Sequence, residues 1–231
     1  MSMVSLKHHP TVFRLLAPRR ERAPYERRVI RPLDDTLIEG FPRSANTYAV
    51  EAFRLLQNRQ CAIGNHFHNP AQFALAERYG LPAMLLLREP EGAVVSFAAY
   101  QATGVRPALQ AYIRFHAPLL RRMRSFVVAP FEEVTSDFSR SIARLNACFG
   151  CDFAHRPLSD ADDAQIREAI HAKRARIAAA RGQLPAATLT LPSADKADQQ
   201  ERLRTQYSQA PAALREQAQV LHARLHESAR D

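Results

Sequence analysis

The composition places this chain among ordinary globular proteins. Of its 231 residues, 46% are hydrophobic and 24% are charged, which excludes a disordered tail protein and a collagen-like chain. Lys and Arg together number 32 against 23 Asp and Glu, and the net charge of +9 predicts an anionic partner: a phosphate or sulfate group, nucleic acid or an anionic lipid surface.

Short apolar runs bounded by Gly and Pro alternate with helical patterns along the first two thirds of the chain. In chain order we expect a strand at 36–41, a helix at 47–56, a short strand at 60–63, a helix at 70–79, a strand at 83–87, helices at 91–102 and 107–124, a strand at 125–129 and a helix at 137–149. Gly80, Gly104 and Gly150 are expected to end the helices that precede them. Strands that alternate with helices predict an α/β fold with a parallel sheet covered on both faces.

The last third of the chain is rich in Ala and Arg and has no strand pattern. We expect helices at 160–180, 195–207 and 211–229, with a loop or lid at 182–194. These helices are expected to belong to the same single domain as the sheet, and residues 1–31 to form a basic N-terminal extension.

The sequence predicts a soluble protein of the cytoplasm. No run approaches the roughly 18 apolar residues of a membrane-spanning helix, and residues 1–31 lack the apolar centre of a secretory signal. Three cysteines, Cys61, Cys148 and Cys151, are too few for a disulfide framework.

An anion-binding loop is predicted at residues 40–47, which read GFPRSANT between a strand and a helix. Compared with the nucleotide-binding pattern G-x-x-x-x-G-K-[ST], the loop keeps Gly40 and Thr47 but has Ala45 for the second Gly and Asn46 for the Lys. The strand at 83–87 ends in Arg88, where a nucleotide hydrolase commonly has an acidic residue for Mg²⁺. These differences predict direct binding of an anionic nucleotide without a metal.

Residues 41–48, FPRSANTY, resemble the 5′-phosphosulfate loop of the sulfotransferases that use 3′-phosphoadenosine-5′-phosphosulfate (PAPS). Arg88 and Ser96, eight positions apart, match the 3′-phosphate motif of that family. His68 occupies the place of the family's catalytic histidine upstream of the arginine-ended strand, and residues 131–134, FEEV, are a weaker match to a later motif. The resemblance extends over residues 37–153 and implies a P-loop-like three-layer α/β/α fold with an added C-terminal helical segment.

The resemblance implies a role for each matching residue. Arg43 would stabilise the charge on the leaving phosphate, and His68 would take the proton from the acceptor. Arg88 and Ser96 would bind the 3′-phosphate. The 5′-phosphate and the adenine would be bound by Ser44, Ala45, Asn46, Thr47 and Tyr48, with Tyr48 stacking on the base. The acceptor would be a hydroxyl or amine of a small molecule, lipid or carbohydrate.

Other interpretations of the same residues stay open. His66 is a second candidate base, because in an extended segment it shares a face with His68. Ser44 or Asn46 could instead cap the following helix. If the position of Ala45 requires a positive φ, its methyl group carries strain that the family's usual glycine avoids.

Metal and redox chemistry are not expected. Cys61, His66 and His68 lack a fourth ligand at a recognised spacing. Cys148 and Cys151 form a C-x-x-C pair, but they close a predicted helix where a redox pair would open one, so we predict structural roles for both.

The basic residues of the last third are predicted to form a solvated helical face, because acidic residues interrupt them and aromatic residues are scarce. They are Arg167, Lys173, Arg174, Arg176 and Arg181. We therefore expect no nucleic-acid partner, although residues 181–182 are a weak match to the basic loop that completes the family's 3′-phosphate site. Two alternative functions are a kinase-like P-loop enzyme and a non-catalytic nucleotide- or polyanion-binding protein.

Overall fold

A parallel four-stranded sheet forms the centre of the protein in a computed structural model that describes residues 9–17, 28–181 and 194–227. The strands are β1 (Thr36–Gly40), β2 (Ile63–Gly64), β3 (Ala83–Leu87) and β4 (Val127–Pro130). Their order in the sheet is β2-β1-β3-β4, and each neighbouring pair is parallel. The sequence predictions of β1 and β3 are confirmed, whereas β2 begins where the predicted strand 60–63 ends.

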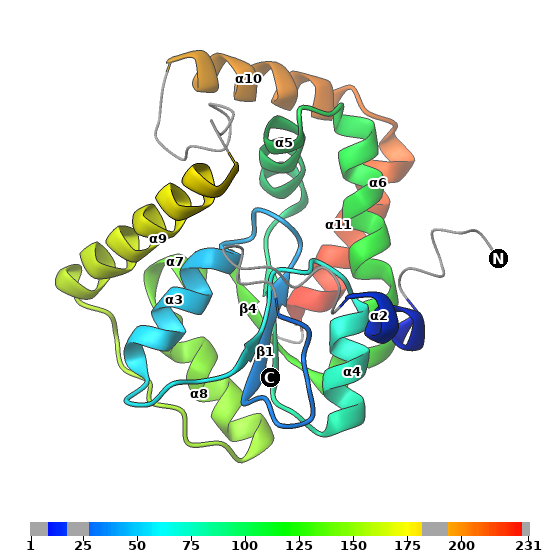
Figure 1. The fold of residues 1–231 in the computed structure, drawn as a ribbon. Helices are drawn as coiled ribbons and strands as arrows, with labels where there is room; N and C mark the ends of the chain where they lie inside the picture. The colour runs from blue at the N-terminus through cyan, green and yellow to red at the C-terminus, as the bar shows by residue number, and fades with distance from the viewer. Residues whose placement is uncertain (1–8, 18–27, 182–193, 228–231) are drawn as a thin grey trace.

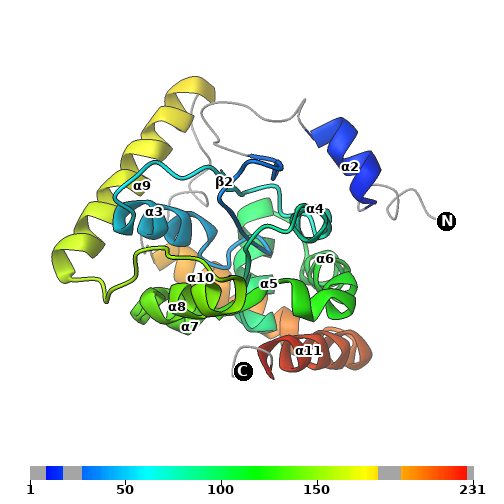
Figure 2. The ribbon, with the colours of Figure 1, turned by 90° about the horizontal axis from the view of Figure 1, so that it is seen from below.

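Helices cover both faces of this sheet (Figures 1 and 2). One face carries α3 (Asn46–Leu56), α7 (Phe131–Ser136), α8 (Phe138–Phe149) and α9 (Asp160–Arg181). The other carries α2 (Pro10–Leu16), α4 (Ala71–Tyr79), α5 (Pro90–Gln101), α6 (Val105–His116), the 3₁₀ helix η2 (Ala117–Ser125), α10 (Ala194–Ser208) and α11 (Ala212–Glu227). The predicted three-layer α/β/α arrangement, with added C-terminal helices, is therefore confirmed.

Strand β3 shows how one apolar run supports two cores. Met84 and Leu86 pack among the side chains of α3 and α8, whereas Leu85 and Leu87 pack on the opposite face among those of α5 and α6. Successive side chains of a strand point to opposite faces, so a strand buried on both sides needs a continuous aliphatic sequence. All five residues of β3 are buried accordingly.

The structure corrects three details of the predicted helices. The single helix expected at 107–124 is instead α6 followed by η2, because Pro118 cannot continue an α-helix and stands in the first turn of η2. Helix α5 ends at Gln101 with Ala102 as its left-handed C-cap, whereas Gly104 is the N-cap of α6. Residues 131–136 form the short helix α7, which the sequence analysis missed.

Two further predictions concern the segment 182–194 and membrane-spanning helices. The predicted loop or lid at 182–194 lies outside the described residues, except for Ala194, which begins α10. Within the described ranges, no helix combines the length and the hydropathy needed to cross a bilayer.

Candidate functional site

The loop after β1 joins the carboxyl end of that strand to the N-terminus of α3. Gly40 is required there, because a Cβ atom at this position would lie 2.5 Å from the backbone oxygen of Leu86 on the neighbouring strand. The first hydrogen bond at this end of α3 runs from the Ala49 N–H to the Ala45 oxygen at 2.9 Å. The N–H groups before Ala49 have no partner within the helix, and they are the groups that bind anions at helix N-termini.

The side chains of this loop do not cap the helix, contrary to one of the interpretations above. The Asn46 Nδ2 donates to the Phe41 oxygen at 2.8 Å, which ties the loop together. The Ser44 hydroxyl is fully buried, and it has no hydrogen-bond partner among the described residues. A buried hydroxyl without a partner is costly, so this position suits an oxygen atom of a bound anion.

Ala45 adopts the left-handed conformation, with φ 61° and ψ 20°. The sequence analysis made strain at Ala45 conditional on a positive φ, and the structure meets that condition. Arg43, two residues earlier, also has a positive φ of 72°. Non-glycine residues in this region cost about 1–2 kcal/mol each, and such strain is concentrated at ligand-binding segments.

The structure brings together the two segments for which the sequence predicts cofactor binding. The Arg43 Nε donates to the Ser96 hydroxyl at 3.0 Å, and the Arg88 Nη1 donates to the Arg43 oxygen at 3.0 Å. Arg88 follows β3 and Ser96 lies in α5, so the contacts join the carboxyl ends of two neighbouring strands. Ligands of open α/β sheets bind at this edge.

The surroundings of Arg88 also involve residues that the sequence analysis did not assign to the cofactor site. Its guanidinium lies over the ring of Phe131, 4.3 Å from the centroid, so this ring is already in contact with a cation. A Cβ atom on Gly92 would come within 3.0 Å of the Arg88 guanidinium, so the glycine leaves room for it. Gly92 also donates its N–H to the Glu89 carboxylate, which caps α5.

A third arginine, Arg174 of α9, interacts electrostatically with Arg43. Burial and the charge of Arg174 lower the pKa of Arg43. Burial also lowers the pKa of Arg88, an effect that Glu89 opposes and Arg43 reinforces, and burial lowers the pKa of Arg174. Arginines stay charged in proteins. The positive charges of Arg43, Arg88 and Arg174, here called the arginine cluster, therefore repel one another, and a bound anion would reduce this repulsion.

The two histidines of the segment after β2 differ in their contacts. The His66 ring lies between Thr47 and Asn65: its Nε2 is 3.2 Å from the Thr47 hydroxyl, and its Nδ1 is 2.7 Å from the Asn65 Oδ1. The His68 Nδ1 is 2.8 Å from the Gly40 oxygen, at the start of the predicted anion-binding loop. The ring centroids lie 5.9 Å apart, and both residues have a positive φ, so the segment is not extended.

Polar contacts that the sequence analysis did not predict connect α9 to α3. The Tyr48 hydroxyl donates to Asp163 at 2.9 Å, and the Lys173 Nζ lies 3.3 Å from the Glu51 carboxylate. Burial and the Asp163 carboxylate raise the pKa of Tyr48 to about 12. The prediction of a solvated basic face is therefore wrong for Lys173, which is 4% exposed, and for the half-buried Arg174. Gly182 and the Arg181 side chain lie outside the described parts of the structure.

Cys61, Cys148 and Cys151 are the three cysteines of the chain. All three are free, and burial raises the pKa of the Cys61 and Cys151 thiols, which disfavours the reactive thiolate. Gly150, between Cys148 and Cys151, is the left-handed cap of α8. The described residues contain no group of three or more His, Cys, Asp or Glu side chains placed to hold a metal ion.

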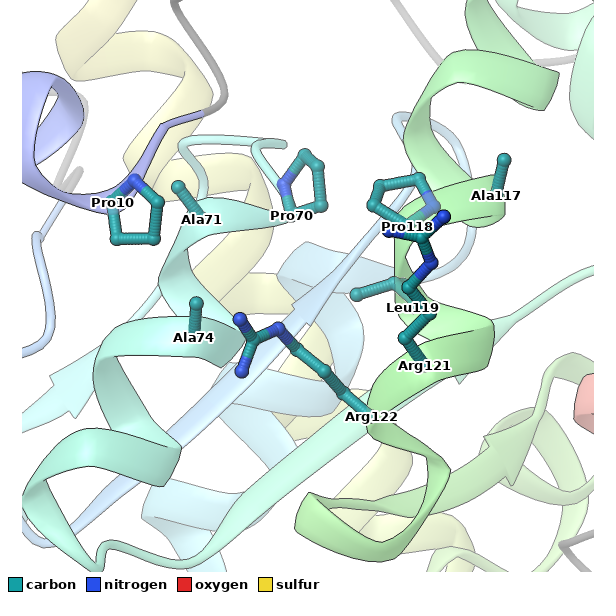
Figure 3. A pocket seen from close by; sticks show the side chains of 9 residues that line it. All are labelled: Pro10, Pro70, Ala71, Ala74, Ala117, Pro118, Leu119, Arg121 and Arg122. Atoms are coloured by element: carbon teal, nitrogen blue, oxygen red, sulfur yellow. The ribbon is translucent and has the colours of Figure 1, made fainter.

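A separate pocket of about 530 Å³ lies between α4 and η2, with Pro10 of α2 at its edge (Figure 3). Proline and alanine side chains make up most of its wall, and the Arg122 guanidinium, which pairs with Glu77, points across it. None of the residues predicted to bind the cofactor lines this pocket. The arginine cluster and the pocket are therefore distinct features.

Comparisons with known proteins identify no family for this chain. No protein-family model and no curated protein matches the sequence. A search with the structure finds a mouse sulfotransferase, SULT7A1, in a crystal structure with PAP; the match has 12% sequence identity, covers 87% of this chain and 90% of that chain, and has a TM-score of 0.44. We assign no property of this chain from a likeness at these values.

Proposed function

We propose that this protein is a sulfotransferase that moves a sulfuryl group from PAPS to an acceptor hydroxyl or amine. The observation that supports this proposal best is the contact between the two cofactor motifs. Arg43 of the phosphate loop donates to Ser96, and Arg88 donates to the backbone of Arg43, although 45 residues or more separate the partners. These contacts between two motifs that were recognised independently in the sequence support one cationic site.

The residues of this site fit a nucleotide with separate phosphate groups. The unpartnered Ser44 hydroxyl and the N-terminus of α3 would bind the 5′-phosphate. Arg88 and Ser96 would bind the 3′-phosphate, and Arg174 would add a third positive charge. Tyr48, whose hydroxyl is held by Asp163, would present its ring to the adenine. Ala45 and Asn46 would contribute through the loop backbone, as Thr47 does at the first turn of the helix.

His68 is the base in this proposal. Both ring nitrogens of His66 contact neighbouring side chains, whereas the contacts of His68 involve its Nδ1 alone among the hydrogen bonds described above. The Nε2 of His68 is thus the nitrogen that would accept the acceptor's proton. An imidazole suits this task near neutral pH.

Bound PAPS would supply the sulfuryl group, with the 3′,5′-bisphosphate as the leaving group. As the acceptor oxygen or nitrogen bonds to sulfur, His68 takes its proton, and the electron pair of the broken S–O bond passes to the phosphate oxygen. The Arg43 guanidinium stabilises the charge that develops on that oxygen. We expect the site's own cations and backbone N–H groups to perform this step without a metal ion.

A transfer assay tests this function. Radiolabelled PAPS, incubated with the protein and EDTA, should label at least one acceptor from a panel of naphthol, decanol and glucosamine. Adenosine 5′-phosphosulfate, which lacks the 3′-phosphate, should be a poor donor in the same assay. Consumption of ATP with Mg²⁺, together with intact PAPS for every acceptor, would instead indicate the kinase-like alternative.

A further inference from the structure

Glu39, at the end of β1, is a fully buried carboxylate that contacts the histidine segment. Its Oε2 accepts the backbone N–H groups of Phe67 at 2.8 Å and His68 at 3.0 Å. Its Oε1 accepts the N–H of Gly40 at 3.1 Å. A charged group without water must be compensated by such bonds, and three backbone donors meet this requirement.

These bonds hold a strained segment in place. His66 and His68 have φ values of 58° and 51°, in the left-handed region that is unfavourable for residues with a side chain. The two N–H groups that Glu39 binds belong to Phe67 and His68. The carboxylate therefore links the phosphate loop at Gly40 to the backbone that carries the proposed base.

The surroundings of the His68 ring determine which nitrogen carries the proton. Its Nδ1 lies 2.8 Å from the Gly40 oxygen and 3.3 Å from the Glu39 Oε1. A backbone carbonyl and an ionised carboxylate both accept hydrogen bonds and donate none. The Nδ1 must therefore be protonated, which leaves the lone pair on Nε2.

We propose that Glu39 is a positioning residue for His68: it fixes the Nδ1–H tautomer and faces the imidazolium that forms when Nε2 takes a proton. The expected effect of Glu39 on catalysis rests on the proposed function, in which His68 is the base. Glu39 is linked to the acceptor only through His68, because its carboxylate is buried and its bonds point to the backbone. In many enzymes a carboxylate or another polar group orients the general base in this way.

The substitution Glu39→Gln tests the proposal with little change of shape. An amide NH₂ in place of Oε1 cannot accept the Gly40 N–H or the His68 Nδ1–H. We expect kcat to fall about 100-fold, since a misoriented base loses most of its contribution. The KM for PAPS should stay unchanged, because the substituted carboxylate does not reach the predicted phosphate contacts.

Glu133→Gln is the matched control, since Glu133 is a mostly buried carboxylate that pairs with Arg144 at 2.6 Å, in α7 and α8. This variant should lose stability without losing kcat. If Glu39→Gln behaves like Glu133→Gln and keeps its kcat, the positioning role is refuted.

The tautomer of His68 provides a second readout that needs no acceptor. In ¹⁵N NMR of the wild-type protein, the neutral form of His68 should show a protonated Nδ1 and a bare Nε2. A protonated Nε2 would overturn the proposal even if Glu39→Gln failed to fold. If no acceptor is labelled in the transfer assay while His68 shows the Nδ1–H form in the wild type and loses it in Glu39→Gln, the proposed function fails and the orientation of His68 by Glu39 stands. An unchanged Nδ1–H form in a folded Glu39→Gln variant would assign the tautomer to the Gly40 carbonyl and refute the role of Glu39.

Discussion

Replacing Arg43 with Met should lower kcat for sulfuryl transfer about 1,000-fold, since removing one preorganised donor to a developing negative charge has an effect of this size. Met keeps an unbranched apolar stem but loses the guanidinium. It also loses the bond from Nε to the Ser96 hydroxyl and the contact with the ring of Tyr100, 5.3 Å from its centroid. The measurement is the initial rate at saturating PAPS.

Two further variants separate the role of Arg43 from a general effect of charge. Arg43→Lys should recover part of the rate, because it restores a cation without the planar fork. Arg106→Met removes an exposed arginine of α6 and should leave kcat within about twofold, since distant surface charges contribute little. An unchanged kcat in Arg43→Met would place this arginine away from the reacting atoms.

Acid should destabilise the fold through His116, which is fully buried in α6. Its Nδ1 is 2.9 Å from the Tyr112 oxygen, and among the described residues its Nε2 has no partner. Burial lowers the pKa of His116 to about 3, against a smaller opposing effect of the Tyr112 carbonyl. In the unfolded chain the same group titrates near pH 6.5. Between about pH 6.5 and 3 the unfolded state therefore binds the extra proton, and the free energy of unfolding falls by up to about 1.4 kcal/mol per pH unit.

Urea unfolding at several values between about pH 7 and 4 measures this effect. His116→Phe removes the titrating group and should flatten the acid limb of the stability curve relative to wild type. His171→Phe, at an exposed position of α9, should follow the wild-type curve in parallel. If the wild type and His116→Phe lose stability equally as the pH falls, His116 is not the cause of the acid destabilisation.

Much of the fold follows from local sequence patterns. The aliphatic run of β3 serves two cores at once, so its length and both of its ends were predictable. Gly150 caps α8 as expected, because only a residue tolerant of positive φ fits that position. The spacing of Arg88 and Ser96 also predicted that the two residues lie near each other. Arg88 follows the end of β3 and Ser96 lies in α5, which begins two residues later, so the short connection limits their separation.

The remaining features depend on contacts between distant parts of the chain. Arg174 was not distinguishable from its basic neighbours, since only the packing of α9 against α3 brings it near the phosphate loop. Glu39 sits within a buried strand, and its partners at Phe67 and His68 come from the segment after β2. The boundary between α6 and η2 did carry a local signal, Pro118, which the helical pattern around it obscured.

Calorimetric titration with 3′-phosphoadenosine-5′-phosphate in the absence of Mg²⁺ tests the cofactor assignment most directly. The wild-type protein should bind this bisphosphate, and Arg88→Ala should weaken the affinity about 100-fold, as expected for loss of a charge-assisted contact to phosphate. Arg106→Ala, which removes an exposed arginine, should bind like the wild type. ADP, without a 3′-phosphate, should bind weakly to all three proteins. Equal affinities for ADP and the bisphosphate, or an Arg88→Ala variant that binds as tightly as the wild type, would contradict a PAPS site in this loop.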